Sequence, residues 1–262
     1  MNKGPFIARA VAIVLCAPPL LAGELRDSEA VLRTATRACD AGLRALRQGN
    51  FAKARTNLER AVATLPAYPE AHLGLGHVAM SEHRFEDALR EYRSARSGYT
   101  EWGERLVDVR MQRYGEIQQE IGRLRDSLMM LQGNYGKTLS PTLVQTTTLR
   151  LENQIRQLES MDQPDATEPL GPPAEVEFAI GNALWRLDRP VEALESWLRC
   201  AEIDRAFPLV YNNIAVARWH RGEYGQALTS LQRAESLGVH VDPEFRDGLV
   251  AAIRRQEGFT EP

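Results

Sequence analysis

Small and bulky apolar residues recur along this 262-residue chain with the spacing of an amphipathic helix. In four segments, Ala is followed by a bulky residue four positions later and by a small residue seven positions later. Steps of four and three place all three residues on one helix face. The sets are Ala54, Leu58 and Ala61; Ala88, Tyr92 and Ala95; Ala193, Trp197 and Cys200; and Ala227, Leu231 and Ala234. We predict a helix in each segment, with this face buried.

A turn and an earlier helix precede each of these segments. Seven positions before each turn stands a small residue that lets two helices approach closely: Gly42, Gly76, Gly181 or Ala215. Asn50 is a residue type that caps a helix starting at Phe51, and Pro208 suits the first turn of a helix. The first two copies are 34 residues apart, as are the last two. The pattern therefore predicts helix–turn–helix units in two phased pairs.

At these residues the sequence resembles the tetratricopeptide-repeat family. The copies span roughly 35–68, 69–102, 174–207 and 208–241. The early aromatic residue of the family pattern is present as Tyr211 and is replaced by Ala38, His72 and Glu177. The resemblance implies an all-α solenoid whose inner helices line a concave groove that binds an extended peptide or a partner helix.

The residues between the two pairs do not follow the repeat. Two apolar stripes flank a break at residues 132–136 and predict an antiparallel, coiled-coil-like hairpin over 103–161, with Pro141 opening its second helix. Residues 162–173 are rich in Pro and predict a linker. We therefore assign 24–102 to an N-terminal segment and the first repeat pair, 174–241 to the second pair, and 242–262 to a capping helix and tail.

The first 23 residues have the features of a secretory signal peptide. Lys3 and Arg9 precede a short apolar run, and small residues follow at Ala22 and Gly23. The run is shorter than the roughly 20 residues needed to span a bilayer, and we expect no membrane span after cleavage. An outer-membrane lipoprotein starting at Cys16 is a less favoured alternative. The chain has 29 Arg and only three Lys, a bias typical of GC-rich bacterial genes, so we expect a periplasmic protein.

Composition and motifs argue against catalysis. The net charge is −3, which offers no basic surface for nucleic acid. The His and Cys spacings match no zinc motif, and no phosphate-binding or dinucleotide-binding glycine pattern occurs. The carboxylates lie on charged helix faces, which predicts solvated surface. We expect no enzyme activity, no metal and no cofactor, and we expect Cys39 and Cys200 to be buried thiols.

The candidate partner-binding groove is defined by inner-helix positions of the second pair. Its residues are Phe178, Asn182, Trp185, Arg186, Asn212, Asn213, Val216, Trp219 and His220. Trp185 and Trp219 occupy equivalent positions and form either an exposed aromatic shelf for a peptide or part of the core. Asn182 and Asn213 resemble the asparagines of a family carboxylate clamp, but Phe178 stands where the clamp has Lys or Arg. They suit helix–helix contact equally well. The equivalent positions of the first pair include Cys39, Leu43, Leu46, Glu70, Leu73, His77 and Met80.

The hairpin tip is a second candidate surface. Met129, Met130, Leu131 and Tyr135 combine flexible apolar side chains with an aromatic ring, which suits an adaptable contact as well as packing at the hairpin end. Two functions follow. The first is a non-catalytic scaffold or adaptor of the bacterial cell envelope that binds another protein in the groove. The second is a structural homo-oligomer assembled through the hairpin.

Overall fold

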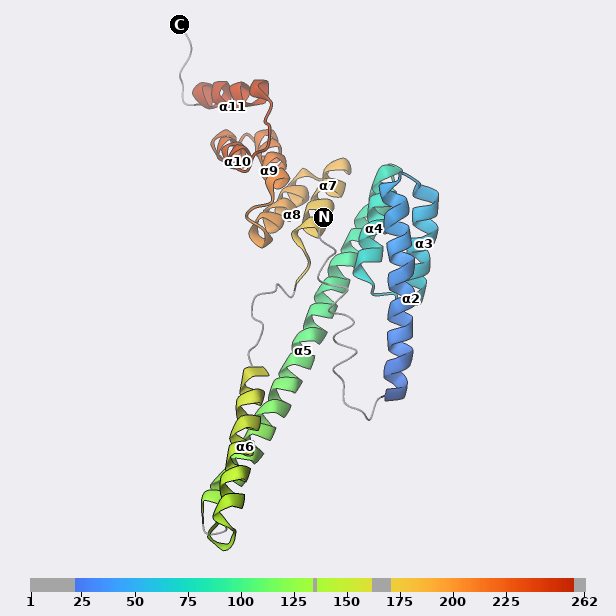
Figure 1. The fold of residues 1–262 in the computed structure, drawn as a ribbon. Helices are drawn as coiled ribbons and strands as arrows, with labels where there is room; N and C mark the ends of the chain where they lie inside the picture. The colour runs from blue at the N-terminus through green and yellow to red at the C-terminus, as the bar shows by residue number, and fades with distance from the viewer. Residues whose placement is uncertain (1–21, 134–135, 162–170, 257–262) are drawn as a thin grey trace. The chain divides into compact units, whose positions relative to one another are not determined.

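The computed structural model describes residues 22–133, 136–161 and 171–256, and these ranges contain helices and no strand (Figure 1). The helices are α2 (Ala22–Arg47), α3 (Phe51–Thr64), α4 (Pro69–Ser81), α5 (Phe85–Gln132), α6 (Pro141–Met161), α7 (Ala174–Arg186), α8 (Pro190–Ile203), α9 (Pro208–His220), α10 (Tyr224–Ser236) and α11 (Pro243–Gln256), with a short 3₁₀ turn at Gly136–Thr138. The all-α prediction is confirmed. The predicted signal peptide lies almost entirely outside the described residues.

Each repeat consists of two helices joined by the same tight turn. The turn residue has a positive φ in every copy: Gly49 (73°), His83 (59°), Asp188 (57°) and Gly222 (73°). The following amide donates back to a carbonyl five residues earlier, as from Asn50 to Ala45 (2.9 Å) and from Glu223 to Arg218 (2.9 Å). Such bonds satisfy carbonyls at the end of the first helix. The Asn50 side chain caps α3 by accepting from the Lys53 amide at 3.1 Å, as predicted.

Within each repeat, a bulky side chain of the second helix lies against the small residue of the first. A methyl group added at Gly76 would lie 2.3 Å from Tyr92, and one added at Gly181 would lie 2.4 Å from Trp197. At Gly42 the corresponding distance is 2.6 Å, to Leu58. These distances leave no room for a side chain. The glycines are therefore required by close helix packing.

The alanine positions of the pattern are buried, as predicted. Ala54, Ala88, Ala193 and Ala227 are all 0% exposed. Their lack of a long side chain lets neighbouring helices pack closely while each still removes its methyl group from water.

The two repeat pairs share one core although about 70 residues separate them in sequence. Leu89, Tyr92 and Tyr99 of α5 belong to the same buried cluster as Val176 of α7 and Trp197 of α8. The described residues 22–101 and 171–256 accordingly form one compact unit. The second pair therefore continues the stack of the first.

Glu177 lies at this junction and corrects the expectation that every carboxylate is solvated. It is 2% exposed, and its side chain accepts from Arg96 of α5 (3.3 Å) and from Arg199 of α8 (3.0 Å). A carboxylate can be buried when charged donors replace its water. Since Glu177 stands where the family pattern has an aromatic residue, an ion pair joins the helices at this point.

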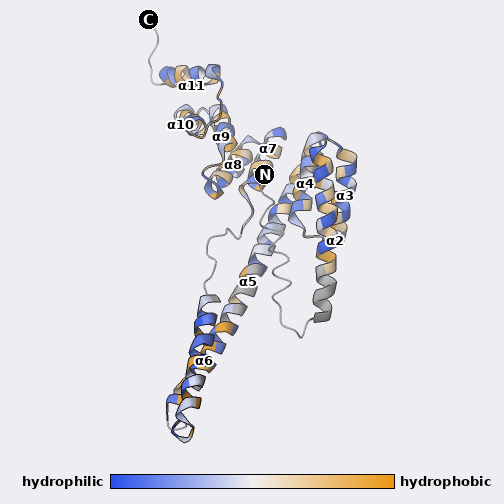
Figure 2. Ribbon diagram, in the orientation of Figure 1, coloured by the Kyte–Doolittle hydropathy of each residue, from blue (hydrophilic) through white to orange (hydrophobic). Residues whose placement is uncertain are grey.

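The described residues 102–133 and 136–161 form a second compact unit, which contains the C-terminal part of α5 and all of α6 (Figure 1). Hydrophobic residues recur along the otherwise hydrophilic α6 (Figure 2). Ile121 and Leu131 of α5 and Ile155 of α6 are buried, and Arg125 bonds Glu159 at 2.8 Å, so the two helices pack side by side. The sequence placed a boundary between residues 102 and 103, but α5 runs through it as one helix. No proline interrupts Phe85–Gln132, and its glycines cost only about 1 kcal/mol each.

The stack ends with α11. Leu249 and Ala252 are buried, and Leu249 packs with Leu231, Ala234 and Val241 in a separate cluster. Arg254 and Arg255 lie in the last turn, where positive charge complements the helix dipole. The helix covers the last repeat with its apolar side.

Glu70 in the first turn of α4 is poorly solvated. Its Oε2 atom is buried and has no hydrogen-bond donor among the described residues. Burial raises the pKa of the Glu70 carboxyl from 4.5 to about 6; a backbone hydrogen bond opposes this rise and the charge of Asp40 adds to it. The ionised form is therefore destabilised in the folded chain.

We expect Gly181→Ala to destabilise the fold by about 1–3 kcal/mol, because its methyl group would overlap the buried Trp197 ring. This outweighs the gain of up to about 1 kcal/mol in helix propensity. Urea unfolding followed by circular dichroism measures the change. The control is Gly225→Ala in α10, which has open space around it and should be neutral or stabilising. Equal stability of the two variants would contradict the packing argument.

We expect Glu70→Gln to stabilise the chain above pH 6 and to have little effect near pH 4.5. The folded pKa lies above the unfolded value, so the folded state loses stability as pH rises from 4.5 through 6. A shift of this size corresponds to about 1–2 kcal/mol at pH 7.5. Unfolding measured at both pH values tests the prediction. Glu59→Gln, at an exposed site of α3, should change stability by less than about 0.5 kcal/mol at either pH.

Candidate protein-binding surface

The sequence-predicted groove residues lie on α7 and α9, the first helices of the last two repeats. The turn after each of these helices, and the second helix of the same repeat, α8 or α10, hold the helix in position. Phe178, Asn182, Trp185 and Val216 are half-buried, while Arg186 is exposed. The side chains are therefore divided between contact with the core and contact with solvent.

Asn182 links the two inner helices. Its side-chain oxygen accepts a hydrogen bond from the Asn213 amide group at 3.0 Å and another from the Trp197 indole N–H at 3.2 Å. A carbonyl oxygen has two lone pairs, so both are used in these contacts. The two asparagines thus hold α7, α8 and α9 together. Asn212 is half-buried and makes no hydrogen bond to the residues that the structure describes.

The two equivalent tryptophans have different neighbours. The Trp185 ring lies 5.6 Å from Trp197 and 5.3 Å from the exposed His220, measured between ring centroids. Trp219 instead lies 5.0 Å from Tyr224 and 5.8 Å from Phe245 of α11. Trp185 and His220 form a partly exposed pair, whereas Trp219 packs beneath the capping helix.

Phe178 extends the apolar part of this surface. Its ring lies 5.0 Å from Phe207, which precedes α9. Both rings pack against the core of the second pair. Phe178 occupies the position at which a carboxylate clamp would have a cation, so this end of the surface is apolar.

The first pair contributes fewer exposed side chains at the equivalent positions. Cys39 is buried, as is Cys200 on α8, and both are free thiols. Burial raises the pKa of both thiols, to about 12 for Cys200. The thiol form is therefore favoured, which makes these residues poor nucleophiles. Leu43, Leu73 and Met80 are half-buried.

The predicted hairpin-tip residues differ in their exposure to solvent. Met129 and Met130 are 72% and 67% exposed, whereas Leu131 is 8% exposed and packs between the helices. Tyr135 lies outside the described residues. An adaptable contact at the tip would therefore use the two methionines.

Across residues 22–133, 136–161 and 171–256, no three His, Cys, Asp or Glu side chains are grouped as metal ligands would be. None of the helices in these ranges has both the length and the apolar character needed to cross a bilayer.

Comparison with known proteins supports the repeat assignment. A family model described as tetratricopeptide repeat matches residues 39–100. Similar solved structures include PilF of Pseudomonas aeruginosa, with 16% identity over 88% of this chain and 95% of that one and a TM-score of 0.35. A thermophilic tetratricopeptide-repeat protein of Thermus thermophilus has 15% identity over 84% of this chain and 98% of that one, with a TM-score of 0.35. PilW, described as a type IV pilus biogenesis factor, has 13% identity over 87% of this chain and 95% of that one, with a TM-score of 0.39. No curated protein gave a match.

The TM-scores all lie below 0.5, so the assignment depends on the matched model and on the repeated helix pairs. The helix pairs have a common turn, a small residue on the first helix and a bulky residue on the second. The matched model indicates no enzyme family. Residues 39–100 are therefore tetratricopeptide repeats, and the helix pairs of residues 174–236 have the same turn and the same small-against-bulky contact.

Proposed function

We propose that the chain is an exported, non-catalytic adaptor of the bacterial cell envelope that binds a peptide or partner helix across α7 and α9. The family is one of protein-interaction scaffolds, which supports the general role. The basic and apolar first residues support export. The location and the binding surface are the specific parts of the proposal.

The observation that carries the proposal is the Trp185–His220 pair. These residues come from consecutive inner helices, lie 5.3 Å apart between centroids, and are half-buried and exposed respectively. Arg186 is exposed beside them on α7. Trp and Arg supply much of the energy of protein interfaces when a partner excludes water from them. A ring already held against the core loses little entropy on binding.

The contacts also indicate the chemistry of the partner. Asn182 uses both lone pairs of its side-chain oxygen within the protein, and Phe178 offers no cation. A terminal carboxylate is therefore a poor ligand for this surface. A partner segment that presents apolar or aromatic side chains to Phe178 and Trp185 fits better, with polar groups reaching Asn212 and Arg186.

We expect the Trp185→Ala variant to remain helical but no longer to bind the partner. The purified chain would be used to capture proteins from an envelope extract of its native organism, with mass spectrometry identifying them. Val191→Ala is the matched control, because Val191 is an exposed apolar residue on the outer helix α8. Circular dichroism checks that both variants fold. Capture of the same proteins by Trp185→Ala would exclude this surface. Trp219 is unsuitable for the test, because its loss would disturb α11.

A second candidate function is self-assembly through the hairpin. Val107, Met111 and Tyr114 follow spacings of four and three on α5 and are 37%, 65% and 46% exposed. Exposed apolar side chains on one helix face are a common feature of oligomer interfaces. This face favours pairing with a second copy of the chain.

For this second function we expect light scattering to give the mass of a dimer, and Met111→Glu to give that of a monomer. A charge placed in an apolar interface would be buried without a partner. Gln112→Glu adds the same charge at a neighbouring exposed position and should leave the dimer intact. A monomer mass for the unmodified chain would rule out this function.

A further inference from the structure

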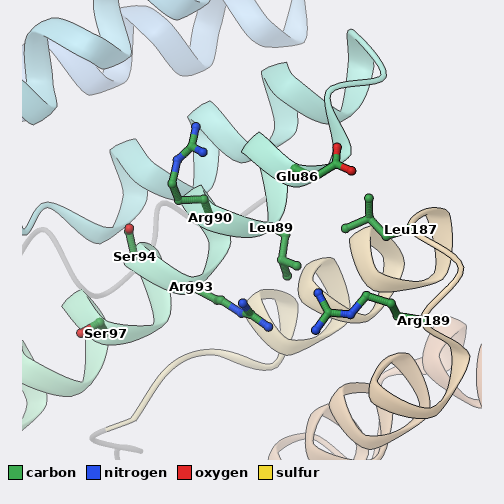
Figure 3. A pocket seen from close by; sticks show the side chains of 8 residues that line it. All are labelled: Glu86, Leu89, Arg90, Arg93, Ser94, Ser97, Leu187 and Arg189. Carbon is green, nitrogen blue, oxygen red and sulfur yellow. The ribbon is translucent and has the colours of Figure 1, made fainter.

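A pocket lies on a different part of the repeat unit from the α7–α9 surface. It is formed by α5 and by the turn between α7 and α8, and its volume is about 420 Å³ (Figure 3). This size falls within the range of ligand pockets in proteins. Its lining residues are Glu86, Leu89, Arg90, Arg93, Ser94, Ser97, Leu187 and Arg189.

Two arginines from different elements converge in this pocket. Figure 3 shows the guanidinium groups of Arg93 on α5 and Arg189 before α8 pointing toward one another. Arg90 extends the other way and pairs with Asp87 at 2.6 Å. Two like charges that face each other repel, and a nearby negative group offsets this repulsion.

Two carboxylates lie near these arginines, and only Glu192 bonds one of them. Glu86 also lines the pocket but forms no ion pair with Arg93 or Arg189 among the described residues. Glu192 accepts from Arg189 at 2.7 and 2.6 Å. The hydrogen bonds of Arg189 lower the pKa of Glu192, and the charge of Arg93 contributes to that lowering. Arg93 itself makes no hydrogen bond or ion pair to another residue in the described ranges. One positive charge in the pocket is therefore uncompensated by a bonded carboxylate.

The repeat architecture does not require this arrangement. The positions equivalent to Arg93 in the other three copies are Glu59, Leu198 and Gln232. Those equivalent to Arg189 are Asn50, Arg84 and Glu223. The copies without these arginines keep the same turn and the same buried core. The repeat fold therefore does not need an arginine at the position of Arg93.

We propose that this pocket binds an acidic side chain of a partner peptide, with the carboxylate between Arg93 and Arg189. Arginine donates two parallel N–H groups, which match the two oxygens of a carboxylate. Leu187 lies beside the two arginines and is half-buried, so it offers an apolar surface to a neighbouring aliphatic side chain of the peptide, whereas Leu89 is 5% exposed and belongs to the core. The ligand is therefore a segment in which Glu or Asp alternates with Leu-like residues.

This site is independent of the proposed adaptor surface. None of its lining residues belongs to the set that includes Trp185, Asn212 and His220. It also differs in chemistry, because it selects a negative group whereas the α7–α9 surface is largely apolar. Loss of one binding activity should therefore leave the other intact.

The test measures binding of two peptides to the purified chain by isothermal titration calorimetry at low salt. The first is acetyl-Leu-Glu-Leu-Glu-Leu-amide, and the second has Gln in place of each Glu. We expect the Glu peptide to bind at least about tenfold more tightly than the Gln peptide. Arg93→Gln should weaken the Glu peptide by about tenfold or more, since it removes a charge-assisted hydrogen bond. Arg93→Lys should restore only part of this, because an ammonium group lacks the planar pair of donors.

Two controls separate the proposal from its alternatives. Arg123→Gln removes an exposed arginine elsewhere on α5 and should not change binding. Trp185→Ala should also bind the Glu peptide normally, and its failure to do so would assign the peptide to the α7–α9 surface instead. Undetectable binding of the Glu peptide, equal binding of both peptides, or unchanged binding by Arg93→Gln would each overturn the proposal. Displacement of the peptide by an equal concentration of inorganic phosphate would show a general oxyanion site, and would overturn the peptide assignment.

Discussion

The fold depends on the direct contact of a bulky side chain with a glycine on the partner helix. Where Tyr92 meets Gly76 and Trp197 meets Gly181, the aromatic ring lies directly against the backbone of the partner helix. The close approach lets the nearby alanines be fully buried. A repeat made of two short helices could not otherwise enclose enough apolar surface, and it still needs its neighbours to complete the core. The stacked repeats and the surfaces they expose follow from this contact.

Much of this architecture could be predicted because it is encoded at short range and repeated. Ala88, Tyr92 and Ala95 lie within two helical turns, and the same pattern recurs 34 residues from its neighbour in each pair. Helix starts such as Phe51 and Pro208 were also predictable, since capping and proline preferences act locally. The path of α5 was not, because the boundary was placed where the repeat pattern ends, whereas the helix continues through it.

The candidate sites were harder to predict because they depend on neighbours distant in sequence. Trp185 and Trp219 are equivalent by spacing, but only Trp219 is covered by Phe245. Glu177 is paired with Arg96, 81 positions away, and only its place in the family pattern set it apart from surface carboxylates. The convergence of Arg93 and Arg189 likewise appears only once the helices are stacked. Periodicity identifies which residues face the core, whereas the candidate sites depend on which surface side chains from different helices come together in the folded chain.

The size match between helices also limits how this gene can change. Trp197 needs Gly181, whereas the smaller Leu231 is accommodated by Ala215. A crossover inside a repeat that joins the first helix of the fourth copy to the second helix of the third would place the Trp197 ring against the methyl group of Ala215. A crossover in the loops between repeats would move both helices together and keep each pair matched. Duplication and shuffling of whole repeats are therefore the tolerated routes by which the array can lengthen or shorten.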